Sequence, residues 1–101
     1  IAIVDNNKIC MLDYCRNILD LDPLKEKFEM FKWEASKVDG HNIAELHKKF
    51  LSAKNSGTGR PKLIIADTVK GNSIPGMEND PLCHIKNLKE DEIDLLVGEL
   101  E

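Results

Sequence analysis

Two short runs of this chain are apolar at every position, and they constrain its fold more than any other feature. Residues 1–4 read Ile-Ala-Ile-Val, and residues 63–66 read Leu-Ile-Ile-Ala. A strand with one face in water alternates apolar and polar side chains, whereas a continuous apolar run is typical of a parallel sheet covered on both faces. Both runs are therefore predicted to be strands buried on both sides.

Three other segments carry the apolar spacing of an amphipathic helix. They cover residues 23–32, residues 42–54 and the chain from about residue 89, with the apolar stripes Leu24, Phe28 and Phe31; Ile43, Leu46, Phe50 and Leu51; and Ile93, Leu96, Val97 and Leu100. Asp22 followed by Pro23 is a typical helix start, and Asn42 with Glu45 resembles a capping box. A weaker strand is predicted over residues 33–39.

The order of strand, helix, strand, helix, strand, loop and helix predicts an α/β fold built on a parallel sheet. Residues 6–21 and 68–88 are predicted loops, the first with a short helical turn near residues 16–19. A sheet of three strands with three main helices leaves its edges exposed, so residues 1–101 are expected to form one partial domain of a larger fold. The first residue is Ile rather than Met, as in an excised or truncated segment.

Composition excludes several classes of partner. The formal net charge is −4 and the basic residues are scattered among acidic ones, which argues against nucleic acid. The sequence holds no apolar run long enough to span a membrane. Cys10, Cys15 and Cys83 are an odd number without metal-type spacing, which favours a reduced, cytoplasmic setting.

Ligands of open parallel sheets bind beyond the carboxyl ends of the strands, where this chain places two polar segments. Asn6 and Asn7 follow the first strand and could offer amide oxygens to Mg²⁺, although an Asn-Asn pair also forms simple turns. Lys70 and Gly71 follow the last strand and suit a phosphate, although a Lys-Gly pair alone is usually a solvated turn. His84 lies in the same loop as a candidate proton carrier or phosphate contact, or as a structural loop residue.

Several blocks in one order resemble transketolase, in particular the C-terminal part of its N-terminal, thiamine diphosphate-binding domain or subunit. The blocks are residues 1–9 (IAIVDNNKI), 23–28 (PLKEKF) with Trp33, 38–43 (VDGHNI), 62–71 (KLIIADTVKG) and 77–79 (MEN) followed by His84. The resemblance implies transfer of a two-carbon ketol unit between sugar phosphates, with thiamine diphosphate and a divalent cation, Mg²⁺ or Ca²⁺.

By position, the resemblance also implies roles for individual residues. Asn7 matches the family's side-chain metal ligand, and Ile9 matches the residue whose backbone carbonyl coordinates the same ion. Lys70 and Gly71 match the loop that passes the diphosphate. His84 matches the histidine that reaches the diphosphate and the substrate, and it is the catalytic candidate.

The sequence also departs from the family pattern. The Gly-Asp-Gly half of the cofactor motif, with its carboxylate ligand, lies upstream in relatives and is absent here, so the isolated chain is expected to be inactive. Tyr14, Ser73 and Ile85 stand where relatives have glycine. The implied partners are the upstream half of the cofactor domain and a pyrimidine-binding domain or subunit, in a homodimer or heterotetramer. The alternatives are a fragment of a deoxyxylulose-phosphate-synthase-like enzyme and a non-catalytic assembly module or remnant.

Overall fold

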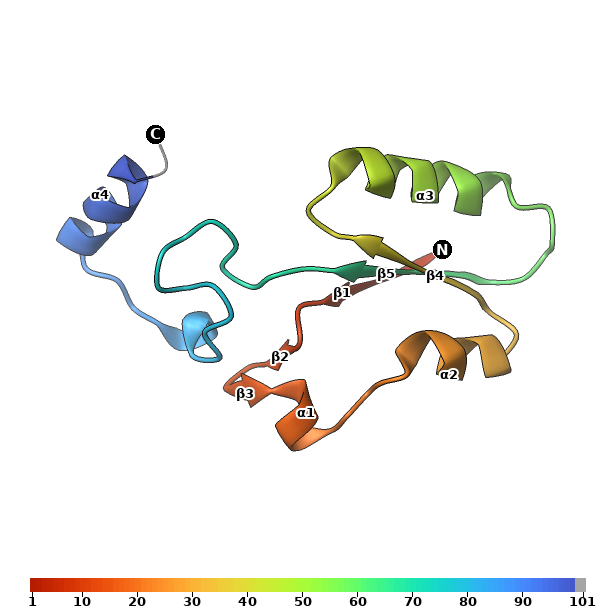
Figure 1. Cartoon of the computed structure of the whole chain (residues 1–101), viewed down its shortest axis with the longest axis horizontal. Helices are drawn as coiled ribbons and strands as arrows, with labels where there is room; N and C mark the ends of the chain where they lie inside the picture. The colour runs from red at the N-terminus through yellow and green to blue at the C-terminus, as the bar shows by residue number, and fades with distance from the viewer. Residues whose placement is uncertain (100–101) are drawn as a thin grey trace. The chain divides into compact units, whose positions relative to one another are not determined.

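The computed structural model describes residues 1–99, which form two compact units (Figure 1). The first, Ile1–Asn6 with Leu21–Thr68, is called the sheet unit. The second, Asn7–Asp20 with the chain from Val69 onward, is called the loop unit.

The sheet unit is a parallel sheet with helices on both faces, as the sequence predicts. Its elements are β1 (Ala2–Asn6), α2 (Leu24–Met30), β4 (Glu34–Asp39), α3 (Ile43–Asn55) and β5 (Lys62–Asp67). The three strands pair in the order β1-β5-β4, and both pairs are parallel. Figure 1 shows α3 on one side of this sheet and α2 on the other. The predicted α/β class is confirmed.

The core of the sheet unit is centred on β5. Leu63, Ile64 and Ile65 are each at most 1% exposed, because β5 has a strand on either side and helices above and below. On the face covered by α3 the core is formed by Val38, Ile64 and Ala66 against Leu46, Phe50 and Ala53. The prediction of a doubly buried strand over residues 63–66 is therefore confirmed.

The same prediction is wrong for β1. Its residues alternate between half-buried and exposed, and Ile3 is 56% exposed. Among residues 1–99, β1 is an edge strand that pairs with β5 alone, and the main contacts of α2 and α3 with the sheet are made to β4 and β5. One face of β1 is consequently largely exposed among the described residues.

Helix α2 is shorter than predicted at both ends. It begins at Leu24, with Pro23 as its N-cap and no side-chain capping bond, so the expected cap by Asp22 does not form. It ends at Met30, and Phe31 is 78% exposed instead of joining the apolar stripe.

A Schellman-type ending explains why α2 stops. Lys32 has a positive φ of 66°, and its N–H donates to the carbonyl of Glu29 at 2.9 Å. The N–H of Trp33 donates to the carbonyl of Phe28 at 3.2 Å, and the two rings meet edge to face at 5.4 Å. A hydrophobic contact of this kind typically accompanies the motif, and it turns the chain directly into β4.

Helix α3 begins where the sequence predicts. The side chain of Asn42 accepts a hydrogen bond from the N–H of Glu45 at 3.1 Å, which confirms Asn42 as the cap. Leu46 and Phe50 pack on the core. Ile43 and Leu51, predicted on the same face, are 82% and 45% exposed, because only one narrow side of α3 faces the sheet.

The loop unit contains β2 (Ile9–Cys10), β3 (Asp13–Tyr14), α1 (Cys15–Ile18), the 3₁₀ helix η1 (Cys83–Ile85) and α4 (Glu90–Gly98). β2 and β3 form a small antiparallel hairpin that the sequence did not predict, while α1 lies one residue before the predicted helical turn. Leu100, expected in the stripe of α4, lies outside the described residues.

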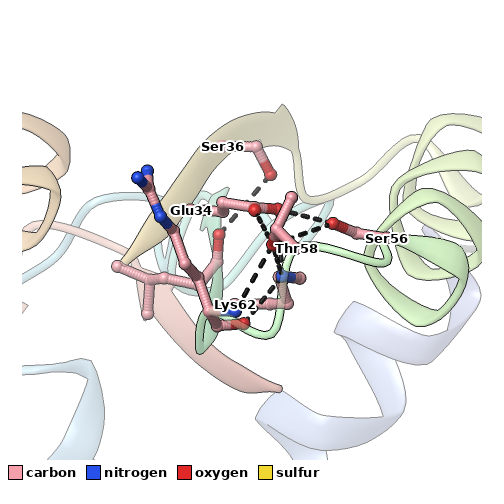
Figure 2. A network of polar contacts seen from close by, with 7 residues as sticks. Glu34, Ser36, Ser56, Thr58 and Lys62 are labelled. Carbon is pink, nitrogen blue, oxygen red and sulfur yellow. Dashed lines mark hydrogen bonds and ion pairs between the residues drawn. The ribbon is translucent and has the colours of Figure 1, made fainter. Parts of the chain in front are cut away.

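A polar network ties the amino ends of β4 and β5 together (Figure 2). Lys62 is only 7% exposed, and its ammonium group lies 3.1 Å from the carboxylate of Glu34. The same ammonium donates to the hydroxyl of Thr58 and to the carbonyl of Arg60, each at 2.7 Å. The Glu34 carboxylate also accepts hydrogen bonds from Ser56, at 2.8 Å, and from Thr58. These partners satisfy a buried cation that would otherwise be costly.

This network predicts a pH-dependent stability. The hydroxyls of Thr58 and Ser56, and then the ammonium of Lys62, lower the pKa of Glu34 from its ordinary 4.5 to about 2. A lowered carboxyl pKa stabilises the fold above pH 4.5, and that stabilisation is lost as the pH falls toward 2. We expect Glu34→Gln to be less stable than the wild type at pH 7 in urea unfolding, and the difference to shrink between pH 4.5 and 2. The matched control is Asp94→Asn, an exposed carboxylate on α4. A Glu34→Gln difference that stays constant over this range would contradict the prediction.

Candidate functional site

The carboxyl ends of β1 and β5 are joined by side-chain hydrogen bonds within the sheet unit. The Asn6 amide donates to the Asp67 carboxylate at 2.7 Å, and the Thr68 hydroxyl donates to Asp5. Asp5 therefore bonds the chain that follows β5. Gly40 lies against the same edge, where a Cβ would come within 2.3 Å of the Thr68 methyl group. This edge is closely packed by its own residues.

The predicted metal ligands, Asn7 and Ile9, lie at the start of the loop unit. The side-chain oxygen of Asn7 accepts a hydrogen bond from the N–H of Ile9 at 3.0 Å. Lys8, between them, has a positive φ of 66°, and its carbonyl accepts from the N–H of Cys15 at 2.8 Å. Ile9 is only 8% exposed. The turn thus fixes the amide oxygen of Asn7 beside the backbone of Ile9, the two groups that the resemblance pairs on one ion.

The predicted diphosphate loop closes on itself through Gly71. Gly71 has a φ of 73°, and a Cβ at this position would lie 2.4 Å from the carbonyl oxygen of Met77. Glycine is therefore required for loop closure, whereas the sequence pattern suggested a close approach of the phosphate. The carbonyl of Lys70 accepts from the N–H of Asn79 at 2.9 Å, which holds the two ends of the loop together. The Lys70 ammonium makes no ion pair with any described residue.

His84 lies in η1, on the exposed surface of the loop unit. Its imidazole has no hydrogen-bond partner among residues 1–99, so its ring nitrogens are available to a ligand. The preceding turn is held by Asp80, which accepts from the N–H of Leu82 at 2.9 Å and from Lys86 at 3.1 Å. The hydrogen bond from the Leu82 N–H, and to a lesser extent the one from Lys86, holds the pKa of Asp80 below its ordinary value.

The structure accommodates the three departures from glycine in different ways. Ser73 keeps a positive φ of 66°, the left-handed conformation that glycine favours, and its N–H donates to Glu78 at 2.7 Å. Ile85 is not among the residues with positive φ and is 55% exposed, so its backbone does not require glycine. The Tyr14 hydroxyl donates to the carbonyl of Asn79 at 3.1 Å.

An apolar hollow of about 160 Å³ lies between α4 and the loop that follows Gly71. Its lining is Ile74, Met77, Leu88, Ile93, Leu96 and Val97. With no polar lining, it does not fit a diphosphate. The apolar stripe of α4 forms one wall of this hollow, and its residues Ile93 and Val97 are therefore only about half buried.

The five predicted site residues all lie in the loop unit: Asn7, Ile9, Lys70, Gly71 and His84. Within the described chain no three His, Cys, Asp or Glu side chains cluster as a metal site would require. The two predicted cation ligands, the Asn7 amide oxygen and the Ile9 carbonyl, are neutral oxygens, and they would fit part of a Mg²⁺ shell that phosphate oxygens and a carboxylate complete. Tyr14 was not predicted as a connecting residue, since nothing local in the sequence signals its contact with Asn79.

A family model described as "Transketolase, thiamine diphosphate binding domain" matches residues 1–100. The chain belongs to this family. The suspected resemblance is thereby confirmed over nearly the whole chain.

This transketolase domain has curated relatives of moderate identity. It is 34% identical over 101 residues to 6-deoxy-6-sulfo-D-fructose transketolase subunit SqwG of Clostridium sp., and 35% identical to one of the subunits of apulose-4-phosphate transketolase from Actinobacillus succinogenes. Both alignments cover 100% of this chain and 36% of the relative. Human transketolase is 34% identical over 100 residues, which cover 99% of this chain and 15% of that protein. The chain thus spans about a third or less of the length of these relatives.

The fold also matches a solved transketolase. The crystal structure of transketolase from Campylobacter jejuni superposes with a TM-score of 0.72 at 28% identity, over 81% of this chain and 12% of that one. Within residues 1–99, no helix combines the length and the apolarity needed to cross a membrane.

Proposed function

We propose that this chain is the C-terminal part of a transketolase cofactor domain, with residues 1–101 as one partial domain. The complete enzyme would transfer a two-carbon ketol unit between sugar phosphates, using thiamine diphosphate and Mg²⁺ or Ca²⁺. The observation that carries the proposal is the family match over residues 1–100, together with five motif residues in one compact unit.

In this proposal the residues of the loop unit hold the cation and the diphosphate. The amide oxygen of Asn7 and the backbone carbonyl of Ile9 would bind the cation, which neutralises and orients the diphosphate. Support comes from the hydrogen bond that fixes Asn7 against the Ile9 N–H at 3.0 Å. The Lys70 ammonium, which has no ion-pair partner among the described residues, would add a positive charge beside the diphosphate.

His84 would be the group of this chain that reaches the reacting substrate. A neutral or protonated imidazole can accept or donate a proton near neutral pH, and this imidazole is exposed and not held by the described part of the protein. The bound thiamine diphosphate would supply the carbanion chemistry of ketol transfer. The residues of this chain would hold its diphosphate end and exchange protons at the substrate.

The proposal makes the site composite. A carboxylate ligand for the cation would come from the upstream half of the cofactor domain, and a pyrimidine-binding domain or subunit would complete the pocket. Relatives named as transketolase subunits support a divided architecture, which would assemble as a homodimer or heterotetramer. The chain alone would be inactive, and the free thiols of its three cysteines suit the cytoplasm.

Removal of both ligands tests this function in the complete enzyme, with this segment joined to the rest of its domain and partner. We expect transfer from a ketose phosphate to an aldose phosphate to disappear after dialysis against a chelator, because diphosphate binding needs the cation. Thiamine diphosphate and Mg²⁺ together should restore activity, and either one alone should not. Activity that survives the dialysis, or that requires pyruvate as donor, would contradict the proposal.

A further inference from the structure

Tyr14 connects the two segments that carry the proposed cofactor residues. Its hydroxyl donates to the carbonyl of Asn79 at 3.1 Å, and the N–H of Asn79 donates to the carbonyl of Lys70 at 2.9 Å. One residue of the loop is thus bonded on its two sides, to Tyr14 and to Lys70. The guanidinium of Arg16 lies over the Tyr14 ring, 4.9 Å from its centre, which adds a cation–π contact to the ring.

The other end of this connection is the turn of residues 7–9, proposed to bind the cation and called the cation-binding turn. Tyr14 pairs with Ile9 across the β2–β3 hairpin. Ile9 in turn donates its N–H to the Asn7 side chain at 3.0 Å. A short path of hydrogen bonds and strand pairing, entirely within the loop unit, therefore runs from Asn7 through Ile9, Tyr14 and Asn79 to Lys70.

We propose that Tyr14 is a positioning residue that couples the cation-binding turn to the diphosphate loop. This inference rests on the proposed function and deepens it. The cation and the diphosphate bind each other. If the protein fixes the distance between the turn that binds the cation and the loop that binds the diphosphate, each ligand therefore binds more tightly when the other is already present. Such coupling is reciprocal: Tyr14 raises the effect of Mg²⁺ on thiamine diphosphate affinity and the effect of thiamine diphosphate on Mg²⁺ affinity equally.

The resemblance to transketolase implies glycine at the position of Tyr14, and this substitution sharpens the test. Glycine offers neither a hydroxyl for Asn79 nor a ring for Arg16. If tyrosine were only an obstruction, glycine would improve cofactor binding. If tyrosine positions the loop, Tyr14→Gly must weaken cofactor binding.

Calorimetry on the complete enzyme tests the coupling, with thiamine diphosphate titrated in the presence and absence of Mg²⁺. Tyr14→Phe removes the hydroxyl and keeps the ring. It should raise the Kd for thiamine diphosphate in Mg²⁺ about three- to tenfold, the range expected for one lost hydrogen bond. Tyr14→Gly should raise this Kd by at least as much. In both variants the effect of Mg²⁺ on the Kd should shrink, and kcat at saturating cofactor should stay unchanged.

Asn17→Ala is the matched control, because among residues 1–99 the Asn17 side chain bonds only to Asp13, at 2.9 Å, and Asp13 keeps its own bond to the N–H of Tyr14 at 2.7 Å when Asn17 is removed. It should leave the Kd and its Mg²⁺ dependence unchanged. A merely structural role for Tyr14 would lower thermal stability without altering the Mg²⁺ dependence, and that outcome would overturn the inference. So would tighter binding by Tyr14→Gly. If the wild-type enzyme binds no thiamine diphosphate, the proposed function fails instead, which separates the two results.

Discussion

Asn7→Ala in the complete enzyme is expected to lower kcat/KM for ketol transfer by about 100-fold or more at limiting Mg²⁺. Loss of groups that merely orient metal ligands costs about 10- to 100-fold in affinity or activity, and a direct ligand should cost at least as much. Alanine would remove the amide oxygen proposed to bind the cation. It would also release the Ile9 N–H, now held by Asn7 at 3.0 Å, so that the second proposed ligand would lose its orientation.

Two further variants separate these effects. Asn7→Asp keeps an oxygen that can accept from Ile9 and bind the cation, so it should retain most of the activity that alanine loses. Asn55→Ala, at the end of α3 in the sheet unit, should behave as the wild type. Activity should be measured as a function of Mg²⁺ concentration, and added Mg²⁺ should partly restore Asn7→Ala. An alanine variant with a normal Mg²⁺ requirement would show that Asn7 binds no cation.

The strands show how far apolar patterns predict this fold. Residues 1–4 and 63–66 carry the same signal, but only the second run is doubly buried. A continuous apolar run indicates that a strand prefers apolar surroundings. The position of the strand within the sheet, however, decides what surrounds the strand. β5 lies between two strands and β1 has one, and no local property of the run determines this order.

The ends of elements and the connections of the site were less predictable. Phe31 continues the helical spacing of α2, but the left-handed Lys32 ends the helix first, and lysine is not a typical signal for that conformation. The hairpin of β2 and β3 has strands of two residues, too short for any periodicity. Tyr14 and Asn79 are 65 positions apart, so their contact appears only in the folded chain. The roles of the site residues stay predictions, because the positions of their side chains do not by themselves identify a ligand.

His84→Gln is expected to lower kcat by about 100-fold or more in the complete enzyme, while the Kd for thiamine diphosphate changes much less. A positioned acid or base contributes about 10²- to 10⁴-fold to a reaction, and glutamine can still donate a hydrogen bond to a phosphate but cannot exchange a proton. The variant should also fold normally, because His84 is exposed and its imidazole has no hydrogen bond to any described residue. Steady-state assays at saturating cofactor, paired with calorimetry, would measure both quantities.

The matched control is His47→Gln, an exposed histidine on α3 in the sheet unit, which should leave kcat unchanged. The same pair decides between an enzyme and an assembly module. If the chain only packs against a partner, both histidines are surface residues and both variants keep full activity. If His84 instead contacts only the diphosphate, the Kd rises and kcat at saturation is preserved. A selective loss of kcat in His84→Gln therefore requires that this exposed imidazole meet the substrate, which a site completed by other parts of the enzyme would allow.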